Sequence, residues 1–340
     1  RILICSAMAN DIKPLLSVRN LRTSFFQDEG VTKAVDGASF EVYPGQTLGI
    51  VGESGCGKSV TAQSILRIVQ EPGRIEEGEI VLTRPDGSQS DLVKLKRDGR
   101  EMRAIRGGEI GLIFQEPMTS FSPVHTVGAQ IIEAVQLHAD VSKQEARRRG
   151  IEALRSVGIP KPERRIDEYS FELSGGLRQR AMIAVALSCN PRLLIADEPT
   201  TALDVTIQAQ ILDLLRKIQQ ERQMAIMLIT HNLGVVAEMA DDVVVMYLGR
   251  VVEEGPVDAI FHDPKHPYTK ALLQSIPSID SAPRVRLPTI TGSIPHPFNR
   301  PPGCPFHPRC TAFQAGRCDR DEPALEDAGA RRRVSCFLYQ

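Results

Sequence analysis

One eight-residue segment limits what this chain can fold into more than any other. Residues 52–59 read Gly-Glu-Ser-Gly-Cys-Gly-Lys-Ser, which matches the phosphate-loop pattern G-x-x-x-x-G-K-[ST]. An apolar run at residues 47–51 precedes this segment, and a helix-prone run follows from Ser59. The glycines allow successive backbone N–H groups to converge on phosphate oxygens, and the positive end of the helix dipole adds to the attraction. The segment therefore predicts nucleotide binding on an α/β fold.

The side chains and the backbone of this loop have different predicted roles. Lys58 is expected to reach the β- and γ-phosphates, and the Ser59 hydroxyl is expected to ligate Mg²⁺. The remaining contacts should come from the backbone, so Cys56 would take part without its thiol. The predicted nucleotide-binding residues are Gly52, Glu53, Ser54, Gly55, Cys56, Gly57, Lys58 and Ser59.

Four short apolar runs predict a mostly parallel sheet with helices on both faces. They span residues 47–51, 110–114, 193–196 and 225–230. Runs that are apolar on both faces are typical of buried parallel strands, and their alternation with helical patterns indicates an α/β domain. The residues that follow the runs are Gly52, Gln115, Asp197 with Glu198, and His231. Because open α/β sheets bind ligands at the carboxyl ends of their strands, we predict one active site there.

Two adjacent carboxylates follow the third run. Asp197 is placed to hold Mg²⁺ through its water shell, and Glu198 is placed to orient or deprotonate the water that attacks the γ-phosphate. The alternative is a pair of carboxylates merely solvated at a strand end. The phosphate loop in the same chain favours the catalytic interpretation.

A helix-rich insert of about residues 116–190 separates the second and third runs. Within it, Ser174 is a candidate N-cap, and Gly175 and Gly176 would permit close backbone approach. From the residues alone, this segment is either an ordinary helix start or a second anion site. Arginines at residues 147–149 predict a solvated helix face.

Proline content divides the chain near residue 255. Ten prolines lie before residue 256 and thirteen lie from there to the end. Such a segment cannot contain long helices or central strands, so we predict a loop-rich extension over residues 256–340 that needs a cross-link. Four of the seven cysteines lie near its end: Cys304, Cys310, Cys318 and Cys336.

These four cysteines favour a metal over disulfides, because the chain shows no developed secretion signal. Their spacing, C-x5-C-x7-C-x17-C, lacks the tight pairs that zinc sites usually use. Four thiolates also suit a [4Fe–4S] cluster. From spacing alone, iron–sulfur, zinc and free or redox-active thiols all remain open.

Charge and hydropathy exclude two classes of protein. Lys and Arg total 41 against 42 Asp and Glu, so the basic excess usual in nucleic-acid-coating proteins is missing. The sequence has no run of the ~18 apolar residues that a membrane-spanning helix needs. Residues 1–13 are expected to be flexible, with Met8 as the native start and residues 1–7 as an upstream artefact.

Taken together, these motifs resemble the ATP-binding subunits of ABC transporters over about residues 14–255. The resemblance rests on the phosphate loop, Gln115, Leu-Ser-Gly-Gly at residues 173–176, Asp197-Glu198, Ala-Leu-Asp at residues 202–204, and His231. It implies that Gln115 senses the γ-phosphate through Mg²⁺ or water and that His231 contacts the γ-phosphate. The chain departs from the usual pattern at Leu177, where the family places Gln.

The same resemblance assigns residues that would act between two ATPase domains. Ser174, Gly175 and Gly176 would cap the ATP held by a partner domain, and Asp204 would link the two sites. Phe25 is the aromatic expected to stack on adenine, with Phe26 as its rival.

A closer resemblance, over about residues 12–340, is to the oligopeptide/dipeptide branch of bacterial ABC importers. It rests on residues 114–120, 266–273 and 303–310. It implies an ATP-hydrolysing subunit on the cytoplasmic face of the cell membrane. Its partners would be a second ATPase subunit, two transmembrane permease subunits and an extracytoplasmic substrate-binding protein, with no nucleic acid. It also points to a [4Fe–4S] cluster on the four tail cysteines.

Two other functions compete with peptide import. The first keeps the ATPase and changes the cargo to nickel or another small solute. The second is a soluble ABC-type ATPase in DNA repair or translation. Such proteins commonly carry two ATPase domains or a long coiled coil, whereas this sequence shows one phosphate loop and no sustained heptads.

Overall fold

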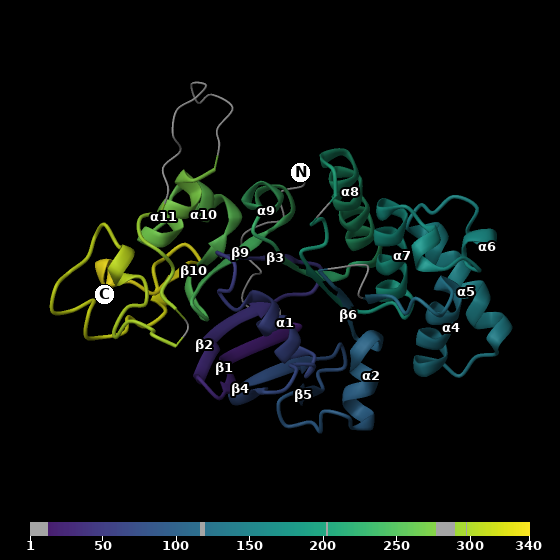
Figure 1. The fold of residues 1–340 in the computed structure, drawn as a ribbon, viewed down its shortest axis with the longest axis horizontal. Coiled ribbons are helices and arrows are strands. Elements are labelled where there is room, and N and C mark those ends of the chain that lie inside the picture. Colours follow the sequence, from purple (N-terminus) through teal and green to yellow (C-terminus); the bar gives the residue numbers. More distant parts are fainter. Residues whose placement is uncertain (1–12, 116–119, 202, 277–289, 297) are drawn as a thin grey trace.

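The computed structural model describes residues 13–115, 120–201, 203–276, 290–296 and 298–340. It contains two sheets with helices packed around them (Figure 1). The eight-stranded sheet has the order β11-β12-β10-β9-β3-β8-β7-β6, and the four-stranded sheet has the order β2-β1-β4-β5. Met8, the middle of the 114–120 motif and residue 202 lie outside the described residues.

The centre of the larger sheet consists of five parallel strands. Their bounds are β9 (Asp242–Tyr247), β3 (Thr47–Val51), β8 (Ala225–Ile229), β7 (Leu193–Asp197) and β6 (Ile110–Ile113). Every residue of β3, β7 and β8 is buried. The four apolar runs of the sequence correspond to β3, β6, β7 and β8, so the four predicted parallel strands are confirmed. Their burial on both faces explains why the runs are continuously apolar.

The smaller, antiparallel sheet was not anticipated from the sequence. It contains β1 (Leu16–Gln27), β2 (Gly30–Val42), β4 (Gly73–Thr83) and β5 (Gln89–Asp91). Buried and exposed positions alternate along much of β2, which therefore has one covered face. Since only alternate residues need be apolar in such a strand, the segment lacks the continuous runs that identified the parallel strands.

Helices cover the sheets and form one end of the molecule (Figure 1). Those near the sheets are α1 (Lys58–Ile65), α2 (Arg100–Gly108), α8 (Val205–Arg222) and α9 (Leu233–Met239). Those of the insert are α4 (Val127–His138), α5 (Lys143–Ser156), α6 (Pro162–Arg165) and α7 (Gly175–Leu187). In the described part of the chain, none of the helices combines the length and the apolar character needed to cross a bilayer.

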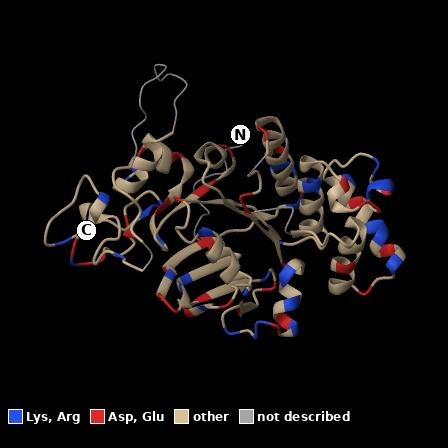
Figure 2. Ribbon diagram, in the orientation of Figure 1, with Lys and Arg blue, Asp and Glu red and all other residues tan. Residues whose placement is uncertain are grey.

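Charged residues of both signs are mixed on the helical end of the molecule (Figure 2). Arg148 and Arg149 both pair with Glu145, and Arg147 pairs with Asp167. The arginine run therefore forms the solvated helix face that the sequence predicted, and the structure adds its ion pairs.

The described part of the C-terminal segment, within residues 256–340, is rich in loops and returns to the larger sheet. Its α-helices and strands after β10 (Arg250–Pro256) are α10 (Val257–His262), α11 (Pro267–Gln274), β11 (Glu326–Asp327) and β12 (Arg333–Val334). β12 pairs antiparallel with β10. The domain boundary predicted after residue 255 thus falls at the end of β10, and the tail adds β12 beside this strand. The division into residues 14–255 and 256–340 stays a prediction.

Asp36 joins the two sheets and the tail. This β2 residue is 4% exposed, and its carboxylate accepts hydrogen bonds from Arg250 of β10 and Arg300 of the tail. Burial alone would raise the pKa of Asp36, but Arg300 and Arg250 hold it below its usual value. The carboxylate is therefore charged in the folded protein at neutral pH.

We expect Asp36→Asn to lower the free energy of unfolding by about 3 kcal/mol at neutral pH, because it removes the carboxylate that pairs with Arg300, whose Nε and Nη2 are buried. Since the folded-state pKa is depressed, this stabilisation is present above the unfolded-state pKa and is lost as the pH falls through the folded-state pKa. Urea denaturation at pH 7 measures it. Asp28→Asn, at an exposed position, is the control and should change stability by less than about 0.5 kcal/mol. Equal losses for both variants would contradict the role of Asp36.

Candidate active site

The loop between β3 and α1 has the backbone that a phosphate loop requires. Gly52, Gly55 and Gly57 adopt positive φ angles of 152°, 77° and 99°. A Cβ added at Gly52 would lie 2.2 Å from the carbonyl oxygen of Met246, and one at Gly57 would lie 2.2 Å from that of Ala34. Glycine is therefore required at these two positions both by conformation and by space.

Lys58, the first residue of α1, is folded back over its own loop. Its Nζ donates hydrogen bonds to the carbonyl oxygens of Gly52 at 2.9 Å and Glu53 at 3.1 Å, and the residue is 6% exposed. Burial raises the pKa of the neighbouring Cys56 thiol, which keeps the thiol neutral. The loop therefore presents a fixed ammonium group where a phosphate would bind.

Ser59 and Asp197 are hydrogen bonded across the site. The Ser59 Oγ donates to Asp197 Oδ1 at 3.1 Å. Burial raises the pKa of Asp197, and the nearby Glu198 carboxylate raises it further. A divalent cation would offset this clustering of negative charge, and oxygen donors of this kind suit Mg²⁺.

Glu198 is the centre of a second group of polar side chains. Its carboxylate accepts hydrogen bonds from Gln115 Nε2 at 3.2 Å and Thr201 Oγ1 at 2.8 Å, and its Oε1 lies 3.0 Å from His231 Nδ1. Burial alone would raise the pKa of Glu198, but the bonds to His231 and Thr201 lower it. The site thus holds an ionised carboxylate able to orient or accept a proton from water. Thr201 was not singled out from the sequence.

The strand register explains why these residues meet. In the parallel pairs, Ile50 lies opposite Ile229, and Asp197 lies opposite the same residue. Ile113 of β6 lies opposite Ala196 of β7. All four strands therefore end at one level of the sheet, and Gln115, Glu198 and His231 each follow within two positions of a strand end.

Ser174, Gly175, Gly176 and Asp204 are not joined to this group by any hydrogen bond in the described residues. Ser174 caps α7 by accepting from the Leu177 N–H at 3.4 Å, and Asp204 caps α8 by accepting from the Ile207 N–H at 2.9 Å. Ser174, Gly175 and Asp204 are exposed. The N-cap predicted at Ser174 is confirmed, and its exposure leaves it accessible to another chain.

The two candidate adenine-stacking residues have different surroundings. Phe25 lies against Gly73 of β4, where an added Cβ would come within 2.6 Å of the ring. The Arg74 guanidinium lies 4.0 Å from the centre of the Phe26 ring. Stacking of Phe25 on adenine stays a prediction.

Two interactions in this region had no signal in the sequence. Gln179 of α7, 2% exposed, donates to the carbonyl oxygen of Pro199 at 2.5 Å and so connects the insert to the segment after Glu198. Arg309, in the tail, forms a two-pronged ion pair with Glu53 of the phosphate loop. Both pairs join residues far apart in the chain, which motif spacing cannot show.

The four tail cysteines line one small cavity together with Phe306 and His266. They are all free thiols. Burial raises the pKa of Cys304 to about 11 and also raises the pKa values of Cys310 and Cys336. In the part of the chain that the structure describes, no group of three or more His, Cys, Asp or Glu residues is arranged to hold a metal ion. The predicted iron–sulfur cluster therefore lacks support here beyond the shared cavity.

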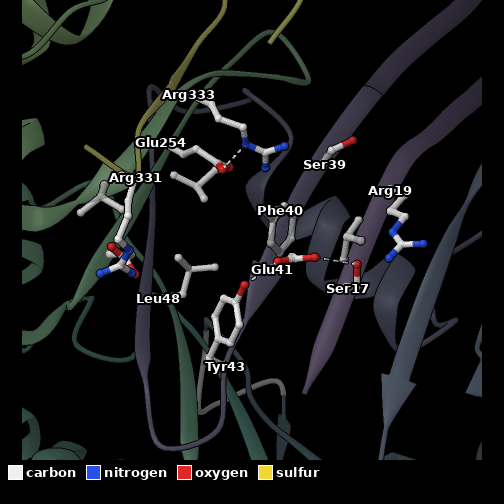
Figure 3. A pocket seen from close by; sticks show the side chains of 15 residues that line it. Ser17, Arg19, Ser39, Phe40, Glu41, Tyr43, Leu48, Glu254, Arg331 and Arg333 are labelled. Atoms are coloured by element: carbon white, nitrogen blue, oxygen red, sulfur yellow. Dashed lines mark hydrogen bonds and ion pairs between the residues drawn. The ribbon is translucent and has the colours of Figure 1, made fainter. Parts of the chain in front are cut away.

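A crevice of about 540 Å³ lies at the opposite end of the parallel strands, beside the first residues of β3 and β9 (Figure 3). Most of its charged side chains are paired with one another, and Arg19 pairs with Glu79 outside the lining at 3.9 Å. Arg333 binds Glu254, Arg331 binds Asp242, and the Tyr43 hydroxyl donates to Glu41. Such a crevice does not offer the unpaired positive charge that a triphosphate requires, so we place the nucleotide at the phosphate loop.

Comparison with known protein families matches two segments of the chain. Residues 35–201 match the ABC transporter family, and residues 252–318 match the oligopeptide/dipeptide transporter C-terminal region. The first segment contains the phosphate loop and Glu198, and the second contains three of the four tail cysteines.

Similar proteins and solved structures agree with both matches. The oligopeptide transport ATP-binding protein AppD of Bacillus subtilis is 50% identical over 96% of this chain and 97% of its own length. A putative peptide import ATP-binding protein of Brucella melitensis is 48% identical over 96% and 98%. The dimeric post-hydrolysis structure of the ATP-binding cassette MJ0796 with ADP and Pi is 26% identical, with a TM-score of 0.62 over 71% of this chain and 98% of that one. The chain belongs to the ATP-binding proteins of ABC transporters, in the group that carries the oligopeptide/dipeptide transporter C-terminal region.

Proposed function

We propose that this chain hydrolyses ATP to power the import of oligopeptides or dipeptides. The observation that carries the proposal is the meeting of Lys58, Ser59, Asp197 and Glu198 at one end of the parallel sheet. The cargo is inferred from relatives that are named for oligopeptide transport and peptide import and match nearly the whole chain. Those names favour peptides over nickel or another small solute.

The phosphate groups of ATP would be bound by the loop and by Lys58. The ammonium group would exchange its bonds to the Gly52 and Glu53 carbonyls for phosphate oxygens. Ser59, Asp197 and Gln115 would hold Mg²⁺, which neutralises charge on the phosphates when bound. The donor set fits this ion, because these residues offer oxygen ligands beside the phosphate loop.

Glu198 would act on the attacking water. Its carboxylate is held by Gln115, Thr201 and His231, so its position is set before the substrate arrives. A carboxylate of lowered pKa is ionised at neutral pH and can orient the water or take its proton. His231 would contact the γ-phosphate from the same side.

We expect Glu198→Gln to leave ATP binding intact and to lower turnover by about 10²- to 10⁴-fold, because the amide cannot accept the proton of the water. Steady-state phosphate release and equilibrium ATP binding measure the two effects separately. Lys58→Ala is the contrasting variant and should weaken ATP binding itself. Normal turnover by Glu198→Gln would contradict the role of this carboxylate.

A second ATPase domain would complete each nucleotide site. Ser174 caps α7, which begins with Gly175 and Gly176, and Asp204 caps α8. Ser174, Gly175 and Asp204 are exposed. Together with the dimeric form of the similar MJ0796 cassette, this supports a site in which Ser174, Gly175 and Gly176 cap ATP bound by a partner and Asp204 links the two sites. The partner is either a copy of this chain or a sibling. Phe25 would stack on the adenine.

In the complex with its partner ATPase, Ser174→Arg should abolish most of the ATP turnover at the partner's site while leaving ATP bound at Lys58 of its own chain. The large charged side chain would block the cap that this chain supplies to the other nucleotide. Photolabelling with an ATP analogue, read separately for each subunit, distinguishes the two sites. Loss of labelling confined to the chain that carries Ser174→Arg would overturn the shared-site arrangement.

The complex would also contain two transmembrane permease subunits and would receive cargo from an extracytoplasmic binding protein. This places the chain on the cytoplasmic face of the membrane as a peripheral subunit. The names of the relatives, which describe transport and import ATP-binding proteins, support these partners.

The four tail cysteines are proposed to hold a metal centre, with a [4Fe–4S] cluster favoured over zinc. The support is that Cys304, Cys310, Cys318 and Cys336 line one cavity as free thiols. Four cysteine thiols match the donor set of such a cluster, which would act as a structural clamp. Phosphate chemistry requires no electron transfer, so no redox step is assigned to it.

Anaerobically purified protein should contain about four irons per chain and absorb broadly in the visible range. Replacing Cys318 by Ser should remove the iron and open the tail to protease. Cys189→Ser, outside the tail, is the matched control and should change neither the iron content nor the protease sensitivity of the tail. Stoichiometric zinc would overturn the iron assignment, and a protease-resistant tail without metal would overturn the metal centre.

A further inference from the structure

A buried ion pair connects the tail directly to the phosphate loop. The Arg309 guanidinium donates from Nη1 to Glu53 Oε2 at 2.8 Å and from Nη2 to Glu53 Oε1 at 3.1 Å. The Arg309 side chain is 4% exposed, and that of Glu53 is 22% exposed. A two-pronged pair of this kind fixes orientation as well as distance.

Glu53 is also held through its backbone. Its N–H donates to the Tyr268 hydroxyl at 2.9 Å, and its carbonyl accepts from Lys58 Nζ at 3.1 Å. Tyr268 belongs to α11 and is fully buried. The residue after the first glycine of the phosphate loop is therefore fixed at its side chain and amide by residues of the C-terminal segment.

Arg309 is itself locked in place. Its Nε donates to the carbonyl oxygen of Thr291 at 3.1 Å, and its Nη1 lies 3.3 Å from the Tyr247 hydroxyl. It also precedes Cys310 directly, so the loop that presents it is the loop between the first two tail cysteines. An ordered tail is therefore a condition for a correctly placed guanidinium.

We propose that Arg309 is a positioning residue for nucleotide binding: it holds Glu53 so that the phosphate loop has its binding shape before ATP arrives. The proposal rests on the ATPase function proposed above and extends it, because the affinity for ATP then depends on the folded tail. A loop that is not held must be ordered by the nucleotide, which weakens binding. The ordering cost is the same for bound ATP and for the transition state, so KM should rise while kcat changes little.

The test compares variants in the intact transporter complex. Arg309→Met should raise the KM for MgATP by about 10- to 100-fold, the range expected for loss of hydrogen bonds to a charged group, with kcat within about threefold of wild type. Arg309→Lys keeps the charge but loses the two-pronged geometry and should restore part of the affinity. Arg320→Met replaces an exposed tail arginine and should leave both parameters unchanged.

A double-variant comparison shows whether the effect passes through Glu53. If it does, Glu53→Gln should raise KM in the wild-type background and add little to Arg309→Met. If the fold-increases in KM caused by the two single substitutions multiply in the double variant, the proposed connection is wrong. An unchanged KM in Arg309→Met with a protease-resistant tail would also overturn it.

Two further outcomes are separable. If Arg309→Met opens the tail to protease, Glu53→Gln decides the question, because it leaves the tail sequence intact, and an unchanged KM there overturns the proposal. If the wild-type complex hydrolyses no ATP, the proposed function fails instead. If the wild-type complex hydrolyses ATP normally and the variants have an unchanged KM, only the proposed role of Arg309 is overturned.

Discussion

The parallel pairing of β3, β8, β7 and β6 determines most of what this chain can do. A parallel register aligns the strand ends, so residues from four distant parts of the sequence reach one level of the sheet. Helices on both faces bury the strands, which leaves their carboxyl ends as the place where polar side chains can gather. Glu198 then obtains partners from two other strand ends, Gln115 and His231, without any local sequence connection between them.

The proline-rich segment is structurally part of this arrangement. Arg309 and Tyr268 contact Glu53 in the phosphate loop, and Arg300 binds the buried Asp36 of β2. Each contact replaces water around a charged or polar group with a fixed partner, which costs free energy unless the geometry is good. A segment with little apolar core can therefore be ordered by a few well-placed polar contacts.

The sequence predicted the parallel strands, the phosphate loop and the Ser174 cap because each depends on residues close together in the chain. Strand β2 was missed because its one-sided burial leaves no continuous apolar run. Neither the Gln179 contact with Pro199 nor the Arg309 contact with Glu53 could be found, since both depend on the folded arrangement of distant segments. The tail cysteines lie close together in the sequence, and in the structure they line one cavity. The metal that they would bind is a proposal.

The pairing of β12 with β10 has a consequence for solubility. A sheet ends in a row of unpaired backbone groups, and a long exposed edge invites pairing with another molecule. Here β12 of the tail pairs with Glu253 and Glu254 of β10, and the sheet then ends at β11, whose residues Glu326 and Asp327 are exposed and acidic. A short, negatively charged border repels a second border of the same kind. The tail thus protects this side of the sheet from edge-to-edge aggregation.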